Sequence, residues 1–189
     1  MKMRIVAGSL KGRKIEAVKG ENTRPTTDKI KENVFNIMGQ FFDGGVVLDL
    51  FAGSGNLGIE ALSRGVEHGV FIDKDARAIR TIRTNLAQLG LEARSEVYRN
   101  DAFRALQVLA KKKAKFSLII LDPPYGKIAI TELLDWLMKH QLLEEEGLVF
   151  CEYAHGMDVS YDAEFFEAYR REVYGTVEIL ILKKVAEVE

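Results

Sequence analysis

Two groups of residues have types and spacings that suit chemistry on a nucleotide-like ligand. The first is Gly53-Ser54-Gly55-Asn56-Leu57-Gly58, which matches the pattern G-x-G-x-x-G between an expected strand and an expected helix. Glycine lets the backbone turn sharply and lets a ligand approach closely, and the start of a helix presents free N–H groups. Asp73, at the expected end of the next strand, can accept hydrogen bonds from both ribose hydroxyls of a nucleoside. Together these residues predict a site for a ligand that contains adenosine.

Two such ligands fit the pattern, a dinucleotide such as NAD and S-adenosylmethionine. NAD places its pyrophosphate at a helix N-terminus, whereas S-adenosylmethionine has no phosphate and carries a positive sulfonium. Asp49 adds a second carboxylate four residues before Gly53, within Leu48-Asp49-Leu50-Phe51. Negative charge there suits the cationic ligand and repels a pyrophosphate, which favours S-adenosylmethionine. Asp101 can either accept a hydrogen bond from the adenine amino group or cap the helix that should begin at Ala102.

The second group is Asp122-Pro123-Pro124-Tyr125, directly after the apolar run Leu118–Leu121. Ligands of an open parallel sheet lie at the carboxyl ends of strands where the strand order reverses, so we expect the strand before Asp122 to neighbour the strand that carries Asp49. The two prolines fix the backbone, and the Asp122 carboxylate and the Pro123 carbonyl offer two acceptors to the two hydrogens of an exocyclic amine. Tyr125 can stack on a flat base.

This arrangement suits methyl transfer to an aryl amine, whose lone pair is otherwise delocalised into its ring. An amine held by both N–H bonds can aim its lone pair at a methyl group, so that catalysis is mostly orientation. Whether Asp122 also accepts the released proton is left open. Two other hypotheses compete with this one. An NAD-dependent oxidoreductase leaves Asp122–Tyr125 unexplained and lacks an evident hydride-transfer pair, and a cofactor-binding RNA module would have no activity.

The hydrophobic pattern predicts the elements that position these motifs. From residue 46, apolar runs of strand length alternate with segments of helical periodicity, which indicates βαβ units and a mostly parallel sheet. Near the end, Phe166–Tyr174 and Val177–Leu182 predict a hairpin with one antiparallel strand. Before residue 40, strands at Arg4–Ala7 and Arg13–Val18 should form a short hairpin, followed by a helix that Thr26 or Thr27 caps. We therefore predict an appendage of residues 1–40 and a domain of residues 41–189. The other expected strands are 46–51, 70–72, 94–98, 118–121 and 148–152, and the expected helices are 56–64, 75–89, 102–110 and one from 130.

Composition excludes several classes of protein. A chain of 189 residues with 47% hydrophobic and 29% charged residues is typical of one globular domain. Cys151 is the single cysteine, which excludes an internal disulfide framework and fits a reducing compartment. No apolar run is long enough to span a bilayer and no signal-peptide core follows the start, so we expect a cytoplasmic protein.

The net charge of −1 alone argues against a nucleic-acid binder, but it conceals an uneven distribution. Residues 1–40 hold nine basic and four acidic side chains, a net charge of +5, and the remainder carries −6. A basic arm on an acidic body keeps a polyanionic substrate in consideration.

The glycine loop, the Asp122–Tyr125 motif and several other segments make the chain resemble the bacterial 16S ribosomal RNA guanine-N2 methyltransferase family. This family lies within the class I S-adenosylmethionine-dependent methyltransferases. The resemblance extends along nearly the whole chain, although the last 25 or so residues carry little of it. The glycine loop and Asp122–Tyr125 are shared with DNA adenine methyltransferases, which are therefore an alternative, while the Arg-Pro-Thr segment and the N-terminal hairpin are the narrower signals. The segments that carry the resemblance are Arg4–Gly8 with Lys11-Gly12-Arg13, Thr23–Asp28 with Glu32–Ile37, Val47–Gly55 with Gly58–Gly65, and Asp122–Tyr125.

The resemblance implies a Rossmann-like class I methyltransferase domain with an N-terminal hairpin and helix. It implies methylation of the N2 amine of one guanine in 16S rRNA, within the small ribosomal subunit or its assembly intermediate. We expect a monomer that needs S-adenosylmethionine and no metal. By analogy, Arg24 and Thr26 cover the methionine end of the cofactor, while Lys11, Arg13 and Arg24 contact RNA. The expected cofactor contacts are Arg24, Thr26, Asp49, Phe51, Ala52, Gly53, Ser54, Gly55, Asp73, Lys74, Asp101 and Ala102, and the expected catalytic residues are Asp122, Pro123, Pro124 and Tyr125.

Overall fold

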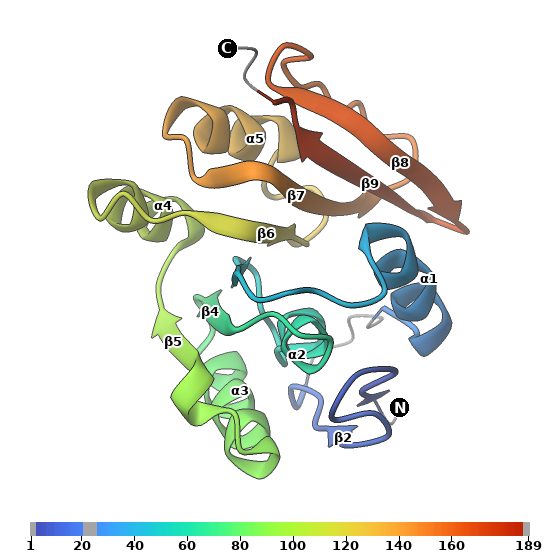
Figure 1. Ribbon diagram of the computed structural model, residues 1–189, viewed down its shortest axis with the longest axis vertical. Coiled ribbons are helices and arrows are strands. Elements are labelled where there is room, and N and C mark those ends of the chain that lie inside the picture. Colours follow the sequence, from blue (N-terminus) through green and yellow to red (C-terminus); the bar gives the residue numbers. More distant parts are fainter. Residues whose placement is uncertain (1–2, 21–25, 187–189) are drawn as a thin grey trace. The chain divides into compact units, whose positions relative to one another are not determined.

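A computed structural model describes residues 3–20 and 26–186 of the chain (Figure 1). The chain forms two compact units that divide between Ala102 and Phe103. The boundary predicted after residue 40 lies inside the first unit and stays a prediction.

The first unit is built on three parallel strands in the order β5-β4-β3. These are β3 (Val46–Asp49), β4 (His68–Asp73) and β5 (Ser95–Arg99). The helices of this unit are α1 (Asp28–Met38), α2 (Asn56–Ser63) and α3 (Ala76–Leu89), with a 3-10 turn, η1, at Glu92–Arg94. The alternation of strand and helix from residue 46 is therefore confirmed in this unit.

Local sequence explains where these helices begin and end. Thr27 caps α1 by accepting a hydrogen bond from the N–H of Ile30 at 3.3 Å. Asp75 caps α3 by accepting one from the N–H of Arg77 at 2.7 Å. Gly90 ends α3 with a left-handed backbone, φ 67°, which glycine adopts without steric cost.

The N-terminal hairpin exists, but its strands are shorter than predicted: β1 is Met3–Arg4 and β2 is Lys14–Ile15. The reason is that the backbone between them bonds to α2 instead of extending the ladder. Ser9 donates its N–H to the Ser63 carbonyl at 2.8 Å, and Gly8 lies so close that an added Cβ would be 1.9 Å from that oxygen. The predicted span Arg13–Val18 is cut short for a similar reason, because Glu16 donates its N–H to Asn85 of α3 at 2.8 Å.

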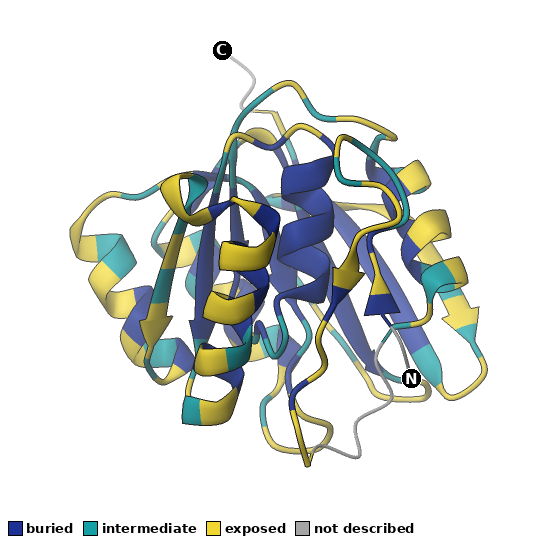
Figure 2. Cartoon of the chain, turned by 90° about the horizontal axis from the view of Figure 1, so that it is seen from below, coloured by how far each residue is buried: buried dark blue, intermediate teal, exposed yellow. Residues whose placement is uncertain are grey.

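Charged groups buried inside the first unit fix the hairpin and α1 to α2. Every residue of α2 is buried, whereas α1 and α3 each keep an exposed face (Figure 2). Within α2, the Glu60 carboxylate lies 3.1 Å from Lys31 Nζ and 3.0 Å from Arg64 Nε, and all three side chains are fully buried. The same carboxylate accepts the backbone N–H groups of Val6 and Ala7 at 3.0 and 3.1 Å. The hairpin is thus held by ionic and hydrogen-bonded contacts that no local sequence pattern predicts.

The second unit contains four strands in the order β6-β7-β9-β8. Strand β6 pairs in parallel with β7, while β9 is antiparallel to both β7 and β8, so the predicted hairpin and antiparallel strand are confirmed. Helix α4 begins at the boundary and runs into this unit. The elements are α4 (Ala102–Lys111), β6 (Phe116–Leu121), α5 (Ile130–Lys139), β7 (Leu143–Ala154), β8 (Phe166–Tyr174) and β9 (Val177–Lys184).

Residue burial in the second unit follows the sequence pattern closely. Leu118–Leu121 is buried throughout, and Leu133, Leu134 and Leu137 form the buried stripe of α5. Cys151 is buried in β7, where burial raises the pKa of its thiol, so it is an inert apolar side chain. Among the described residues, no helix has the length and apolar character needed to cross a membrane.

Candidate functional site

The glycine loop joins β3 to α2 and needs glycine at three points. Gly53 and Gly55 have φ of 55° and 84°, the left-handed region, and Gly55 is the residue that precedes the first turn of α2. An added Cβ on Gly58 would lie 2.5 Å from the ring of Phe71, so this glycine permits close packing of α2 on the sheet. An added Cβ on Gly53 meets no atom within 4 Å, which leaves open space next to the loop.

Asp49 lies beneath the loop and interacts with the N-terminus of α2. Asp49 is only 2% exposed, and its Oδ2 accepts a hydrogen bond from the backbone N–H of Gly58 at 3.0 Å. Burial raises the pKa of Asp49 to about 7, and the nearby Asp73 adds to the rise, while the Gly58 N–H opposes it. A carboxylate therefore occupies a helix-terminal donor that a pyrophosphate would otherwise use.

Asp73 ends β4 and organises the loop from the other side. Its Oδ2 accepts the N–H of Gly53 and its Oδ1 accepts the N–H of Asp75, both at 2.9 Å. Each carboxylate oxygen can accept more than one hydrogen bond, so Asp73 keeps the capacity to hold ribose hydroxyls. The parallel register places Asp49 opposite Phe71, two residues before Asp73, and brings both acids to the carboxyl end of the same strand pair.

The structure describes all but one of the remaining predicted cofactor residues of the first unit. Phe51 is partly exposed, Ala52 is buried and donates its N–H to Ile72 at 2.9 Å, and Lys74 is exposed. Asp101 is exposed and its N–H is bonded to Asn100 Oδ1 at 2.9 Å, which leaves its two predicted roles open. Thr26 is partly exposed, Ala102 is buried, and Arg24 lies outside the described residues.

Sequence analysis missed Asn85, a buried side chain of α3 that links three segments. Its Nδ2 donates to the carbonyls of Ser54 and Glu16 at 2.9 and 3.0 Å, and its Oδ1 accepts the N–H of Glu16. Asn85 thus ties the glycine loop to the hairpin. A polar residue on the apolar face of an amphipathic helix, beside Ile82 and Leu86, is the signal that would have identified it.

The second motif follows β6 in the second unit. Asp122 is partly exposed and Pro123 is buried. Tyr125 is 54% exposed, and a ring that stacks on a base must be accessible in this way. Burial of part of the phenol raises the pKa of Tyr125, and the carboxylates of Glu152 and Asp122 raise it further. The glycine loop and this motif belong to different units, so the predicted proximity of the strands that precede them stays a prediction.

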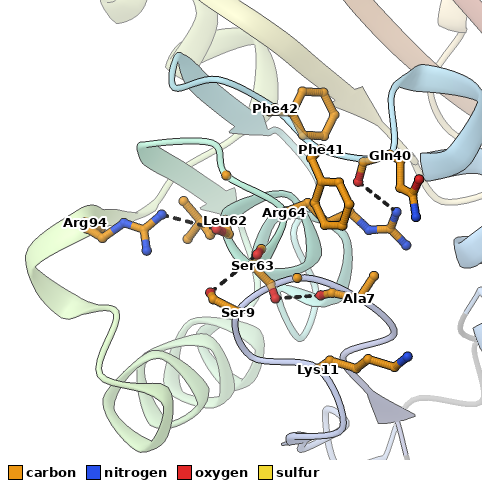
Figure 3. A pocket seen from close by; sticks show the side chains of 12 residues that line it. Ala7, Ser9, Lys11, Gln40, Phe41, Phe42, Leu62, Ser63, Arg64 and Arg94 are labelled. Atoms are coloured by element: carbon orange, nitrogen blue, oxygen red, sulfur yellow. Dashed lines mark hydrogen bonds between the residues drawn. The ribbon is translucent and has the colours of Figure 1, made fainter.

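A hollow of about 630 Å³ lies in the first unit where the hairpin turn meets the end of α2 (Figure 3). Its lining includes Ser9, Ser63, Phe41 and Lys11, one of the predicted RNA contacts. Arg13, another, is exposed and donates from its guanidinium to the Gln88 carbonyl at 2.7 Å. Both cations therefore sit on the surface of the hairpin. Within the described parts of the chain, no group of three or more His, Cys, Asp or Glu side chains could hold a metal ion.

These observations define a class of protein. A strand, a glycine turn and a helix with carboxylates at two adjacent strands, followed by an acid-Pro-Pro-aromatic loop after a later buried strand, are the features of a Rossmann-like class I methyltransferase. The chain belongs to the family described as "Conserved hypothetical protein 95", whose model matches residues 3–183.

Several known proteins that are similar to this chain are named as methyltransferases. It is 48% identical to "Putative rRNA methyltransferase YlbH" of Bacillus subtilis (strain 168), over 96% of this chain and 99% of the relative. It is 33% identical to "Ribosomal RNA small subunit methyltransferase D" of Escherichia coli (strain K12), over 79% of this chain and 74% of the relative. A solved structure, "Putative methyltransferase yhhF from Escherichia coli", is 30% identical with a TM-score of 0.84, over 99% of this chain and 100% of that one. The predicted family and fold class are thus confirmed.

Proposed function

We propose that this protein transfers a methyl group from S-adenosylmethionine to the exocyclic N2 amine of a guanine in small-subunit ribosomal RNA. The observation that carries the proposal is the similarity, along most of the chain, to relatives named as small-subunit rRNA methyltransferases. The residues of both motifs supply the groups that such a reaction needs.

The glycine-loop region fits S-adenosylmethionine better than a dinucleotide. Asp49 already accepts the Gly58 N–H at the start of α2, so a pyrophosphate would meet a carboxylate in place of free donors. Asp73 retains acceptor capacity for the ribose, and the open space beside Gly53 lets a ligand approach the backbone. When bound, S-adenosylmethionine supplies an electrophilic methyl group on a cationic sulfonium. The two carboxylates favour that positive charge electrostatically.

Asp122–Tyr125 would bind and orient the base that is methylated. The Asp122 carboxylate and the Pro123 carbonyl would each accept one N–H of the guanine N2 amine, which directs the nitrogen lone pair away from the ring. The exposed Tyr125 ring would stack on the base. After transfer the amine nitrogen carries an extra proton, which Asp122 would accept under this proposal.

The substrate and setting follow from the same proposal. We assign RNA contact to Lys11, Arg13 and Arg24, and cofactor cover to Arg24 and Thr26. The substrate is 16S rRNA in the small subunit or its assembly intermediate, the protein acts as a monomer in the cytoplasm, and the reaction uses no metal. Because the whole chain has a net charge of −1 and its excess positive charge is confined to residues 1–40, binding to free RNA should be weak and sensitive to salt unless the ribosomal surface adds contacts.

The test compares Asp122→Ala with the wild-type protein. Transfer of a labelled methyl group to small subunits that lack the modification should fall about 100- to 1,000-fold, because the amine loses its oriented acceptor. S-adenosylhomocysteine binding, measured by calorimetry, should be nearly unchanged. Asp135→Ala, which removes an exposed carboxylate of α5 in the same unit, is the matched control and should keep full activity.

Two results would contradict the proposal. Unchanged turnover by Asp122→Ala would remove the assigned role of Asp122. Transfer by the wild-type protein to adenine in duplex DNA, with none to small subunits, would favour the alternative of a DNA adenine methyltransferase.

A further inference from the structure

Glu152 lies in the second unit at the level of the proposed amine-binding motif. Strands β6 and β7 are parallel neighbours, and Leu121 of β6 is paired with Cys151 of β7. Asp122 follows Leu121 just past the end of β6, and Glu152 follows Cys151 within β7, so both residues lie at the same end of these neighbouring strands. Adjacent parallel strands are about 4.8 Å apart, and residues at the same level project from the same face. The register therefore places Glu152 and Asp122 at the same end of this strand pair, and the charges of both act on the Tyr125 phenol.

Glu152 is not a surface acid. The residue is 6% exposed, and buried carboxylates are held in place by specific partners, so its position is well defined. The Tyr125 phenol experiences the charges of both Glu152 and Asp122. Both carboxylates thus lie near enough for their charges to act on the Tyr125 side chain, whose ring is proposed to stack on the base.

Nucleobases differ in the group that stands next to their exocyclic amine. In guanine the neighbour of the N2 amine is N1–H, a donor. In adenine and cytosine the neighbour of the amine is a ring nitrogen with a lone pair, an acceptor. An acceptor-only carboxylate beside the amine site therefore attracts guanine and repels the other two amine-bearing bases.

We propose that Glu152 is a specificity-determining residue that accepts the N1–H of the target guanine while Asp122 and Pro123 hold its N2 amine. This inference rests on the proposed function and extends it, because it assigns the choice of guanine over adenine to one side chain. The shared acid-Pro-Pro-Tyr motif does not distinguish these bases, whereas a carboxylate one strand away does.

The test uses a base that keeps the reactive amine but reverses the neighbouring group. 2,6-Diaminopurine has the 2-amine of guanine and a lone pair at N1. Once the wild-type target guanine is mapped by primer extension, small subunits are reconstituted with guanine or with 2,6-diaminopurine at that position. The measured quantity is the ratio of kcat/KM for the two subunits, determined for wild type and for Glu152→Gln.

The wild-type protein should prefer guanine by about 10- to 100-fold, the discrimination that one well-placed base contact gives. In Glu152→Gln the ratio should fall toward one, because the amide can accept from N1–H or donate to the N1 lone pair. Glu146→Gln, an exposed carboxylate on the same strand, should keep the wild-type ratio. A ratio measured on one enzyme preparation does not depend on the fraction that is folded.

Each possible result bears on the proposal. An unchanged ratio in Glu152→Gln, whether or not total activity falls, would assign Glu152 a structural role and overturn the inference while leaving guanine-N2 methylation intact. Wild-type methylation of a base other than guanine would overturn both the inference and the proposed function.

Discussion

Each unit contains a cluster of acids and bases around a buried glutamate, and these two clusters differ in how far their side chains are exposed to water. In the first unit, Glu60 contacts Lys31 and Arg64, and none of the three side chains is exposed. In the second unit, Glu178 contacts Arg171 at 2.8 Å and His155 at 3.0 Å, and these two partners are about half exposed.

The difference in exposure implies a difference in purpose. The Glu60 cluster joins the hairpin and α1 to α2, and Lys31 Nζ extends it by donating to the Arg4 carbonyl at 2.6 Å and to Asn56 at 2.8 Å. Burial lowers the pKa of Lys31 against the opposing pull of Glu60, so removal of that acid would leave buried cations without compensation. A buried cluster of this kind fixes where one segment attaches to another.

The Glu178 cluster joins three neighbouring strands that already share a hydrogen-bonded ladder. Burial alone would raise the pKa of Glu178, but bonds from His155 and Tyr153, together with Arg171, hold it below its ordinary value. Because water screens the outer partners, each should contribute little to stability. The comparison therefore predicts that substitutions in the first cluster change the free energy of unfolding strongly and that substitutions in the second change it little.

The largest effect should come from Glu60→Gln. The amide cannot neutralise Lys31 and Arg64, so the free energy of unfolding should fall by about 5 kcal/mol, the upper end for a broken buried ion pair. Urea denaturation followed by circular dichroism measures it, and Glu67→Gln, an exposed residue of the same unit, is the control. A loss below about 1 kcal/mol would remove the distinction between the two clusters.

An intermediate effect should come from Asp49→Asn, and it should depend on pH. The folded pKa of Asp49 is about 7, above its unfolded value, so the folded state holds a proton that the unfolded state has released. Stability from this group is present at low pH and is lost as pH rises through 7. Between pH 5 and pH 8 the wild-type protein should lose about 3 kcal/mol that Asp49→Asn does not lose. Denaturant melts without cofactor at both pH values measure this, and parallel pH profiles would contradict it.

The smallest effect should come from Arg171→Ala. Glu178 keeps its bonds to Tyr153 and His155, both 3.0 Å long, so the free energy of unfolding should change by less than about 1 kcal/mol. The change should shrink further in 1 M salt, because the guanidinium is screened. A salt-independent loss as large as that of Glu60→Gln would show that exposure does not separate the clusters.

Much of the fold could be predicted from the sequence. The sequence pattern predicted each α-helix that the described residues form, although not the 3-10 turn η1, and caps such as Asp75 and Gly90 set helix ends within a residue or two. Helix ends depend on local hydrogen bonds, which neighbouring residues specify. The hairpin strands were predicted too long because their length depends on α2 and α3, which are distant in sequence.

The site residues also divide into those that the sequence predicted and those that it did not. The glycine loop, Asp73 and the Asp122 motif are recognisable because their function requires particular residues at fixed spacing. Asn85 and Glu152 carry no such spacing. The sequence marks Asn85 only as a polar residue on the apolar face of a helix, and its two remote partners were revealed by the structure, as was the place of Glu152 by the register of β6 with β7.

The sequence by itself determined the class of chemistry, since a glycine loop, a following acid and an acid-Pro-Pro-Tyr segment are local patterns with direct chemical meaning. It also determined the alternation of strands and helices, because periodicity is a property of consecutive residues. Tertiary structure alone decided the partners of buried charges. Glu60 precedes Arg64 by four residues in the same helix, so that contact is local. The other partners of Glu60 come from residues 6, 7 and 31, which only folding brings within 3.1 Å. Buried charges require specific partners, and these partners can be residues distant in the sequence that the fold brings into contact.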